Sequence, residues 1–195
     1  MVLELLALAG IPTAISTTLG TNEAIRSEDT KEKEKKLTTE CHLYAYCEAD
    51  SRKRDQVHGK QVVLRDNKVF LEDKSSKGFQ GLPFSGFYVT YPNDAKPMGL
   101  VSMISHDPPA MGWLYVDKVT FELKYGNRTS SIEHIVGPWD FTEDELGVTL
   151  AGEELFVAVE EKDNQWALYY DRNDDGTGLP KKKRVLEVSL ERKPK

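Results

Sequence analysis

The chain has 195 residues, enough for one domain with an appendage and too few for a multidomain enzyme. Its 32 Asp and Glu outnumber its 26 Lys and Arg, so the formal net charge is −6. This acidic balance argues against broad binding to nucleic acid, because such proteins neutralise phosphates with an excess of cations. Three Trp, eight Tyr and seven Phe supply the bulk for one hydrophobic core.

The N-terminal part of the chain differs from the rest in its pattern of apolar and charged residues. The apolar run at residues 2–9 contains a Glu, follows no Lys or Arg, and is too short to span a bilayer. Residues 13–25 carry a partial helical stripe, and residues 27–36, SEDTKEKEKK, have charges of both signs and no apolar face. We predict that residues 1–37 form a helical appendage and a charged linker. The helix docks on the domain, binds a partner protein or lies on a membrane surface, and the absence of cations before Arg26 disfavours a membrane contact.

From residue 38 onward the sequence is typical of short strands joined by tight turns. Asp66–Asn67 and Asp117–Lys118 each separate two alternating segments, and residues 119–125 alternate apolar with polar side chains. We expect about nine to eleven strands. The predicted fold of residues 38–195 is mainly β, an antiparallel meander closed into a barrel, calycin- or lipocalin-like by analogy only. A two-sheet β-sandwich is the alternative, and the absence of a fixed repeat disfavours a propeller or solenoid.

The two cysteines, Cys41 and Cys47, lie in one predicted strand. Six residues of strand separate them by about 20 Å, so they cannot form a disulfide unless the strand breaks. Free thiols are typical of a reducing compartment, so we predict a cytoplasmic protein. The basic run at residues 181–184 adds a nuclear location as a second possibility.

Four sequence blocks point to a family. They are SRKRDQVHG (51–59), GFYVTYP (86–92), KYGNRTSSIEHIVGPWDFTEDE (124–145) and WALYYDRNDD (166–175). Together they resemble a family of uncharacterised intracellular proteins from filamentous fungi, and the resemblance covers nearly the whole chain. It implies an intracellular fungal protein, and it carries no activity, cofactor or catalytic residue.

Familiar catalytic and metal-binding motifs are missing from the sequence. It has no GxSxG, P-loop, GxGxxG or HExxH, and its four histidines show no metal-ligand spacing. Residues 171–176 match the first half of an EF-hand loop, but Lys182 occupies the position of the twelfth-position Glu, so an acidic turn is favoured. We expect no metal and no cofactor.

Two groups of residues are candidates for ligand contact. His134, Tyr125, Trp139, Trp166 and Tyr170 are predicted to line the barrel interior, with His134 as an acid, base or hydrogen-bonding group. Arg52 and Arg54 belong to a compact basic cluster that suits a phosphate or carboxylate on a ligand. A core histidine and a solvated loop are the plainer interpretations of the two groups.

Three functions are compatible with these patterns, and the sequence leaves open whether the protein is an enzyme. The first is a binding module that holds a small apolar or amphipathic molecule inside the barrel. The second is an isomerase, cyclase or dehydratase of a small metabolite, with His134 as acid or base. The third is a protein–protein adaptor, using the N-terminal helix or the acidic residues 140–163, which include nine Asp and Glu and one Lys.

Overall fold

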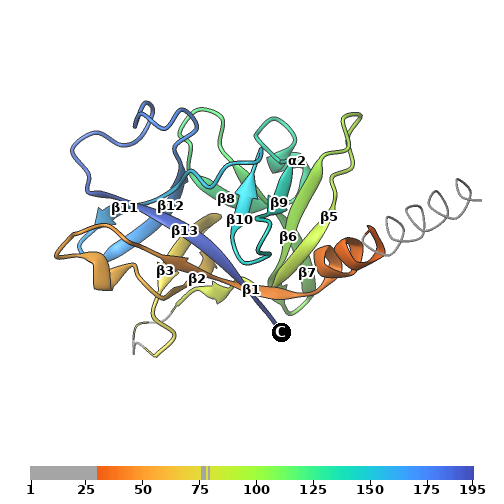
Figure 1. The fold of residues 1–195 in the computed structure, drawn as a ribbon, viewed down its shortest axis with the longest axis horizontal. Helices are drawn as coiled ribbons and strands as arrows, with labels where there is room; N and C mark the ends of the chain where they lie inside the picture. The colour runs from red at the N-terminus through yellow and green to blue at the C-terminus, as the bar shows by residue number, and fades with distance from the viewer. Residues whose placement is uncertain (1–29, 76–77, 79) are drawn as a thin grey trace, which may run out of the picture. The chain divides into compact units, whose positions relative to one another are not determined.

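A computed structural model describes residues 30–75, 78 and 80–195 (Figure 1). The predicted helix at 13–25 and the apolar run at 2–9 lie outside the described residues. Residues 30–38 are helical. The chain divides into two compact units, Met1–Lys36 and Leu37–Lys195, and the strands belong to the second.

In the described part of the second unit, thirteen strands carry almost all of the regular structure. The helical elements are a short 3-10 helix, η1 (Arg54–Gln56), and one turn of α-helix, α2 (Arg128–Ser131). The strands are β1 (Cys41–Tyr46), β2 (Lys60–Arg65), β3 (Lys68–Glu72), β4 (Leu82–Pro83), β5 (Gly86–Thr90), β6 (Met98–His106), β7 (Pro109–Val116), β8 (Leu123–Gly126), β9 (Trp139–Phe141), β10 (Val148–Leu150), β11 (Phe156–Lys162), β12 (Gln165–Tyr170) and β13 (Val185–Pro194).

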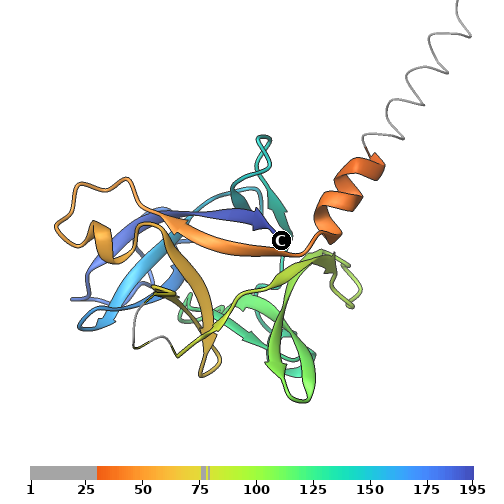
Figure 2. The same ribbon diagram turned by 90° about the horizontal axis from the view of Figure 1, so that it is seen from below.

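Nine of the described strands form a closed antiparallel ring. Their order is β12-β11-β13-β1-β5-β6-β7-β8-β3, and β12 pairs with β3 to complete the ring. Figure 2 shows β1 in orange beside β13 in dark blue, where the first strand of the barrel meets the last. The prediction of a mainly β, antiparallel barrel is therefore confirmed, and the ring is not divided into the two sheets of a sandwich.

The connectivity is more complex than the predicted meander. Three lobes, each of a first strand, a hairpin and a last strand, follow one another along the chain. They are β1–β5 around the hairpin β2–β3, β6–β9 around β7–β8, and β10–β13 around β11–β12. The meander prediction fails because several ring neighbours, such as β3 with β8 and β3 with β12, are neither consecutive in the chain nor its first and last strands.

The lobes are equivalent in their hydrogen bonding. The first strand of each lobe pairs with the last strand of the preceding one, as β6 with β5, β10 with β9 and β1 with β13. Within each lobe, the first hairpin strand pairs with the segment that follows the hairpin: β2 with β4, Val116 with Ile135, and β11 with β13. The three hairpins also pair with each other, through β3–β8, β3–β12 and Glu122 with Tyr169. The arrangement has an approximate threefold symmetry.

The predicted strand at residues 119–125 begins later than its alternating pattern indicates. Residues 118–120 form a turn, and β8 starts at Leu123. The side chain of Asp117 accepts from the backbone N–H groups of Val119 and Thr120, at 2.9 and 3.1 Å. This local hydrogen bonding competes with strand pairing, so it ends β7 and delays the next strand.

Large side chains fill the interior of the barrel. Phe156 stacks on Trp139 with ring centroids 6.0 Å apart and meets the ring of Tyr170 edge-on at 5.4 Å. Trp166 is 1% exposed in the same hydrophobic cluster, and the Tyr170 hydroxyl donates to the carbonyl of Leu150 at 2.7 Å. Aromatic side chains bury large apolar areas, so these residues supply much of the apolar area that is buried inside the barrel.

An ion-pair network occupies the junction where the three hairpins meet. The Lys68 ammonium contacts the carboxylates of Glu122 and Glu161, and Lys124 contacts Glu122 at 3.2 Å. The single O–H of Tyr169 is shared between the same two carboxylates, with the hydroxyl oxygen 3.1 Å from Glu122 and 2.8 Å from Glu161. Partial burial alone would raise the pKa of Glu122, but Lys68 and Lys124 bring it below its usual value. The network joins one residue or more from each hairpin.

Replacing Phe156 by Ala tests the aromatic core. The change leaves a cavity between Trp139 and Tyr170, and we expect it to lower the free energy of unfolding by about 3–5 kcal/mol in urea titrations. The control is Val119→Ala at a side chain that is 73% exposed, for which we expect a change within about 0.5 kcal/mol. Equal, small effects of both substitutions would contradict a close-packed interior.

The junction network predicts a pH dependence of stability. A carboxyl group whose pKa is lower in the folded state contributes stability above its unfolded pKa, and this contribution disappears as the pH falls through the folded pKa. We therefore expect Glu122→Gln to lower the free energy of unfolding by about 1–2 kcal/mol at pH 7, and by much less at pH 3. Urea unfolding at the two pH values measures the difference. A loss of the same size at both would assign the effect to packing rather than to charge.

Candidate functional site

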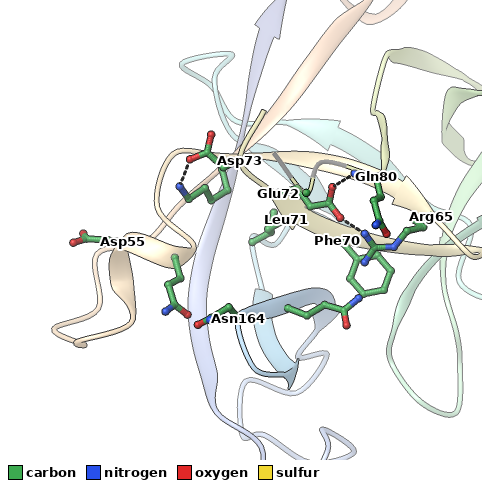
Figure 3. Close-up of a pocket in the computed structure, with 12 residues that line it drawn as sticks. Asp55, Arg65, Phe70, Leu71, Glu72, Asp73, Gln80 and Asn164 are labelled. Carbon is green, nitrogen blue, oxygen red and sulfur yellow. Dashed lines mark hydrogen bonds and ion pairs between the residues drawn. The ribbon is translucent and has the colours of Figure 1, made fainter. Parts of the chain in front are cut away.

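A polar cleft of about 510 Å³ lies between elements of the first and third lobes (Figure 3). The loop that carries η1, the hairpin β2–β3 with the segment after it, and the start of β12 contribute its walls. Its lining residues are Asp55, Gln56, Lys60, Arg65, Phe70, Leu71, Glu72, Asp73, Gly78, Gln80, Asn164 and Gln165. Carboxamide, carboxylate and cationic side chains outnumber the apolar ones.

The cations of the cleft are already paired with its anions. The Arg65 guanidinium pairs with Glu72 and lies 4.5 Å from the centroid of the Phe70 ring. On the same wall, Lys60 pairs with Asp73 at 2.7 Å. Hydrogen bonds from Lys60 and Ser75 bring the pKa of Asp73 well below its usual value, so this carboxylate stays charged at neutral pH. A ligand in this cleft would have to break an ion pair before it could use one of these charges.

The carboxamides of the cleft have NH₂ groups that are not used in hydrogen bonds. The Gln56 Oε1 accepts from the indole Nε1 of Trp166 at 3.1 Å, and the Asn164 Oδ1 accepts from the Lys53 ammonium at 3.1 Å. In each case the oxygen is used, and the NH₂ group has no hydrogen-bond acceptor among the described residues. Each side chain is thus held by its oxygen and retains two N–H donors.

Two further carboxamides and one carboxylate complete the polar lining. The side chains of Gln80 and Gln165 form no hydrogen bond within residues 30–75, 78 and 80–195. The Asp55 side chain is 94% exposed and lies 3.9 Å from Arg54, a distance at which a solvated pair contributes little. In Figure 3, Asp55 points away from the Arg65–Phe70 end of the cleft.

Most of the aromatic residues predicted to line a ligand pocket belong to the packed core. Trp139, Trp166 and Tyr170 are at most 4% exposed, and all three are members of the main hydrophobic cluster. Tyr125 is partly buried and packs against that cluster. All four residues belong to or pack against the main hydrophobic cluster, and Phe156 lies against both Trp139 and Tyr170.

His134 lies apart from this aromatic group. Its ring stacks on Tyr115 with centroids 5.1 Å apart, and its Nδ1 accepts from the backbone N–H of Lys118 at 3.3 Å. The segment before it contains the helical turn α2, which Asn127 caps by accepting from the N–H of Ser130. His134 is partly buried, it is not among the residues that form or pack against the main hydrophobic cluster, and it does not line the polar cleft.

The basic cluster around Arg52 and Arg54 contributes to the cleft through a different member. Arg52 is exposed, and the Arg54 Nε donates to the carbonyl of Cys47 at 2.8 Å, which ties the η1 loop to the end of β1. Lys53, between them, pairs with Glu160 at 3.0 Å and orients Asn164. The two arginines do not converge on one anion site.

The residues that matter most in this cleft carry no signal in the sequence. Gln56, Gln80 and Asn164 belong to no motif, and only their position next to β12 and β3 brings them together. Residues 171–176, the half EF-hand, form an exposed turn in which Asp171 accepts from the N–H of Gly176. Across the described residues, no group of three or more His, Cys, Asp or Glu is placed to hold a metal ion.

The sequence of nearly the whole chain matches one protein family. Residues 17–195 match the fungal β-trefoil domain. The chain belongs to this family. No curated protein and no solved structure matches it. Among the described residues, no helix is long and apolar enough to cross a membrane.

The name trefoil describes the three lobes, whose hairpins meet at one junction. Family membership supports the fungal origin that the four sequence blocks implied. It names a β-trefoil where the sequence suggested a calycin or lipocalin, and that analogy is not confirmed. In this chain the interior holds the hydrophobic core, and the polar cleft lies on the surface between the first and third lobes.

Gln56→Met tests the link between the cleft and the core. The change removes the acceptor of the Trp166 indole N–H, and we expect a loss of about 1–3 kcal/mol in the free energy of unfolding, together with a shift in tryptophan emission. Gln165→Met, at a neighbouring carboxamide with no partner in the described chain, is the matched control and should change neither. The same loss in both variants would show that Gln56 is not a specific anchor.

Proposed function

We propose that this β-trefoil is a binding module that holds a small, uncharged, hydroxyl-bearing ligand, such as a mono- or disaccharide, in the polar cleft between its first and third lobes. The proposal rests on a difference between the charged and the uncharged polar side chains of the cleft. Its cations are paired with its anions, whereas the carboxamides of Gln56, Gln80, Asn164 and Gln165 retain unused hydrogen-bonding groups.

Carboxamides suit hydroxyl groups because each offers two donors and one acceptor in a plane. A hydroxyl group is both a donor and an acceptor, so it can bond to the NH₂ of one amide and the oxygen of another. Phe70 and Leu71 lie in the wall of the cleft, but each is only 4% exposed, so such a ligand would be held mainly by hydrogen bonds. Side chains already held by Trp166 and Lys53 lose little conformational entropy on binding.

The cleft favours a polar ligand at the surface over an apolar one inside the barrel. Trp139, Trp166 and Tyr170 leave their mutual space filled, so an interior ligand would have to displace core side chains. An acid–base role for His134 stays a prediction, and such a site would be separate from the polar cleft, which His134 does not line.

Asn164→Asp tests the proposal with the least disturbance to the fold. The aspartate keeps the oxygen that accepts from Lys53 and tolerates the positive φ of 60° at this position, but it lacks the NH₂ donors. We expect neutral saccharides that give saturation-transfer NMR signals with the wild type to lose at least tenfold in affinity.

Asn67→Asp is the matched control. Asn67 occupies the equivalent turn of the first hairpin with the same φ of 60°, and it does not line the cleft. Its variant should bind as the wild type does. The proposal fails if no saccharide of a broad neutral panel binds to the wild type, or if both variants lose affinity equally.

A further inference from the structure

A second surface of the molecule is formed by two adjoining clefts that share no residue with the polar cleft. One, of about 710 Å³, lies along β9 and β10, and the other, of about 260 Å³, lies along β11 and β13. Glu154 and Leu155 line both, so the two clefts adjoin, and we call them together the acidic groove. Its apolar walls come from Met98, Pro138 and Phe141 at one end and from Phe156 and Val188 at the other.

The charge of the acidic groove is of one sign. Glu143, Glu153 and Glu154 line the larger cleft, and Glu48, Asp174 and Glu187 line the smaller one. No Lys, Arg or His is among the described residues that line either cleft. None of these six carboxylates forms an ion pair in the described part of the chain.

This surface contrasts with the rest of the molecule. Elsewhere the carboxylates of Glu72, Asp73, Asp117, Glu122 and Glu160 are each paired with a Lys or Arg. Next to the groove, a third cleft adds Lys181 to its lining, which marks where the one-signed surface ends. The acidic groove therefore brings six unpaired carboxylates together on adjoining clefts, although exposed carboxylates such as Asp94 and Asp163 also lack an ion pair elsewhere in the described residues.

Two buried polar atoms at the groove lack partners. Trp139 lines the larger cleft and is 1% exposed, and its indole Nε1 has no hydrogen-bond acceptor among the described residues. Asp171 lines the smaller cleft, and its buried Oδ1 likewise has no donor within the described chain. A buried polar atom without a partner costs free energy, and the two atoms need opposite partners: Trp139 Nε1 needs an acceptor, such as a peptide carbonyl, and Asp171 Oδ1 needs a donor, such as a peptide N–H or an ammonium group.

The electrostatics of Glu154 also favour a cationic ligand. Partial loss of hydration and the nearby carboxylates of Asp144 and Glu191 raise the pKa of Glu154 above its usual value. An approaching cation lowers that pKa again and offsets the repulsion. Glu154 stands between the two clefts, where a ligand that occupies both must pass.

We propose that the acidic groove binds an extended Lys- and Arg-rich segment of a partner protein. Several cationic side chains spaced along one chain match carboxylates spread over two clefts, which a single small amine cannot reach together. The aliphatic stems of Lys and Arg pack on the apolar walls while their heads reach the carboxylates at the rim. This partner site is independent of the saccharide cleft.

The test measures binding of a fluorescein-labelled hexa-arginine peptide to the full chain by fluorescence anisotropy. The wild type should bind it, with an affinity that falls as NaCl rises from about 50 to about 300 mM. Glu154→Gln/Glu187→Gln should weaken binding at least tenfold, because it removes one carboxylate shared by both clefts and one from the smaller cleft. Spermine serves as the competitor and should displace the peptide only at concentrations at least tenfold higher than unlabelled hexa-arginine.

Asp94→Asn/Glu133→Gln is the matched control, since it removes two exposed carboxylates that line neither the polar cleft nor the acidic groove. It should change the affinity by less than twofold. The proposal is overturned if hexa-arginine does not bind, if both double variants weaken binding equally, or if spermine competes as well as the peptide. The saccharide titration of the same variants should be unchanged, so the two proposals fail separately.

Discussion

Closure of the strand ring at the hairpin junction is the constraint on which the rest of the structure depends. β3 pairs with β8 on one side and with β12 on the other, and the Glu122–Tyr169 bridge connects the remaining pair of hairpins. Hairpins from all three lobes thus meet at this junction, and each depends on the other two for its pairing partners there. Backbone pairing at this point requires the charges of Lys68, Glu122 and Glu161 to be brought close together, and their mutual contacts offset the cost of that proximity.

Both candidate sites follow from this closure. Pairing of β3 with β12 brings the η1 loop of the first lobe beside the β11–β12 turn of the third, so that Gln56 meets Trp166 and Lys53 meets Asn164. The acidic groove lies where β9 and β10 join the second and third lobes. In each case the site is made of residues from different lobes. For this reason, no contiguous sequence motif indicates either site.

Local structure is predictable from the sequence where one short-range rule decides it, and the threefold arrangement is not. Asp66 and Asn67 both have positive φ and join β2 to β3, as a two-residue hairpin turn requires. The first and second strands of the lobes, in contrast, are joined by residues 47–59, 107–108 and 151–155, so equivalent strands recur at no fixed spacing. The carboxamides of the polar cleft carry no distinctive pattern either, because their role depends on which neighbour uses each oxygen.

The distribution of charge links the two surfaces. With a formal net charge of −6, some carboxylates must lack cationic partners wherever the chain places them. Scattered singly over the surface they would be solvated and would interact little beyond the Debye length, about 8 Å in physiological salt. Glu143, Glu154 and Glu187 are instead gathered beside apolar walls, and partial loss of hydration together with the neighbouring Asp144 and Glu191 disfavours the charged form of Glu154. The polar cleft shows that this chain pairs its carboxylates where nearby cations permit, as Glu72 with Arg65. The exclusion of every Lys, Arg and His from the described lining of the groove therefore leaves a surface that a cationic partner stabilises and an anionic one does not approach.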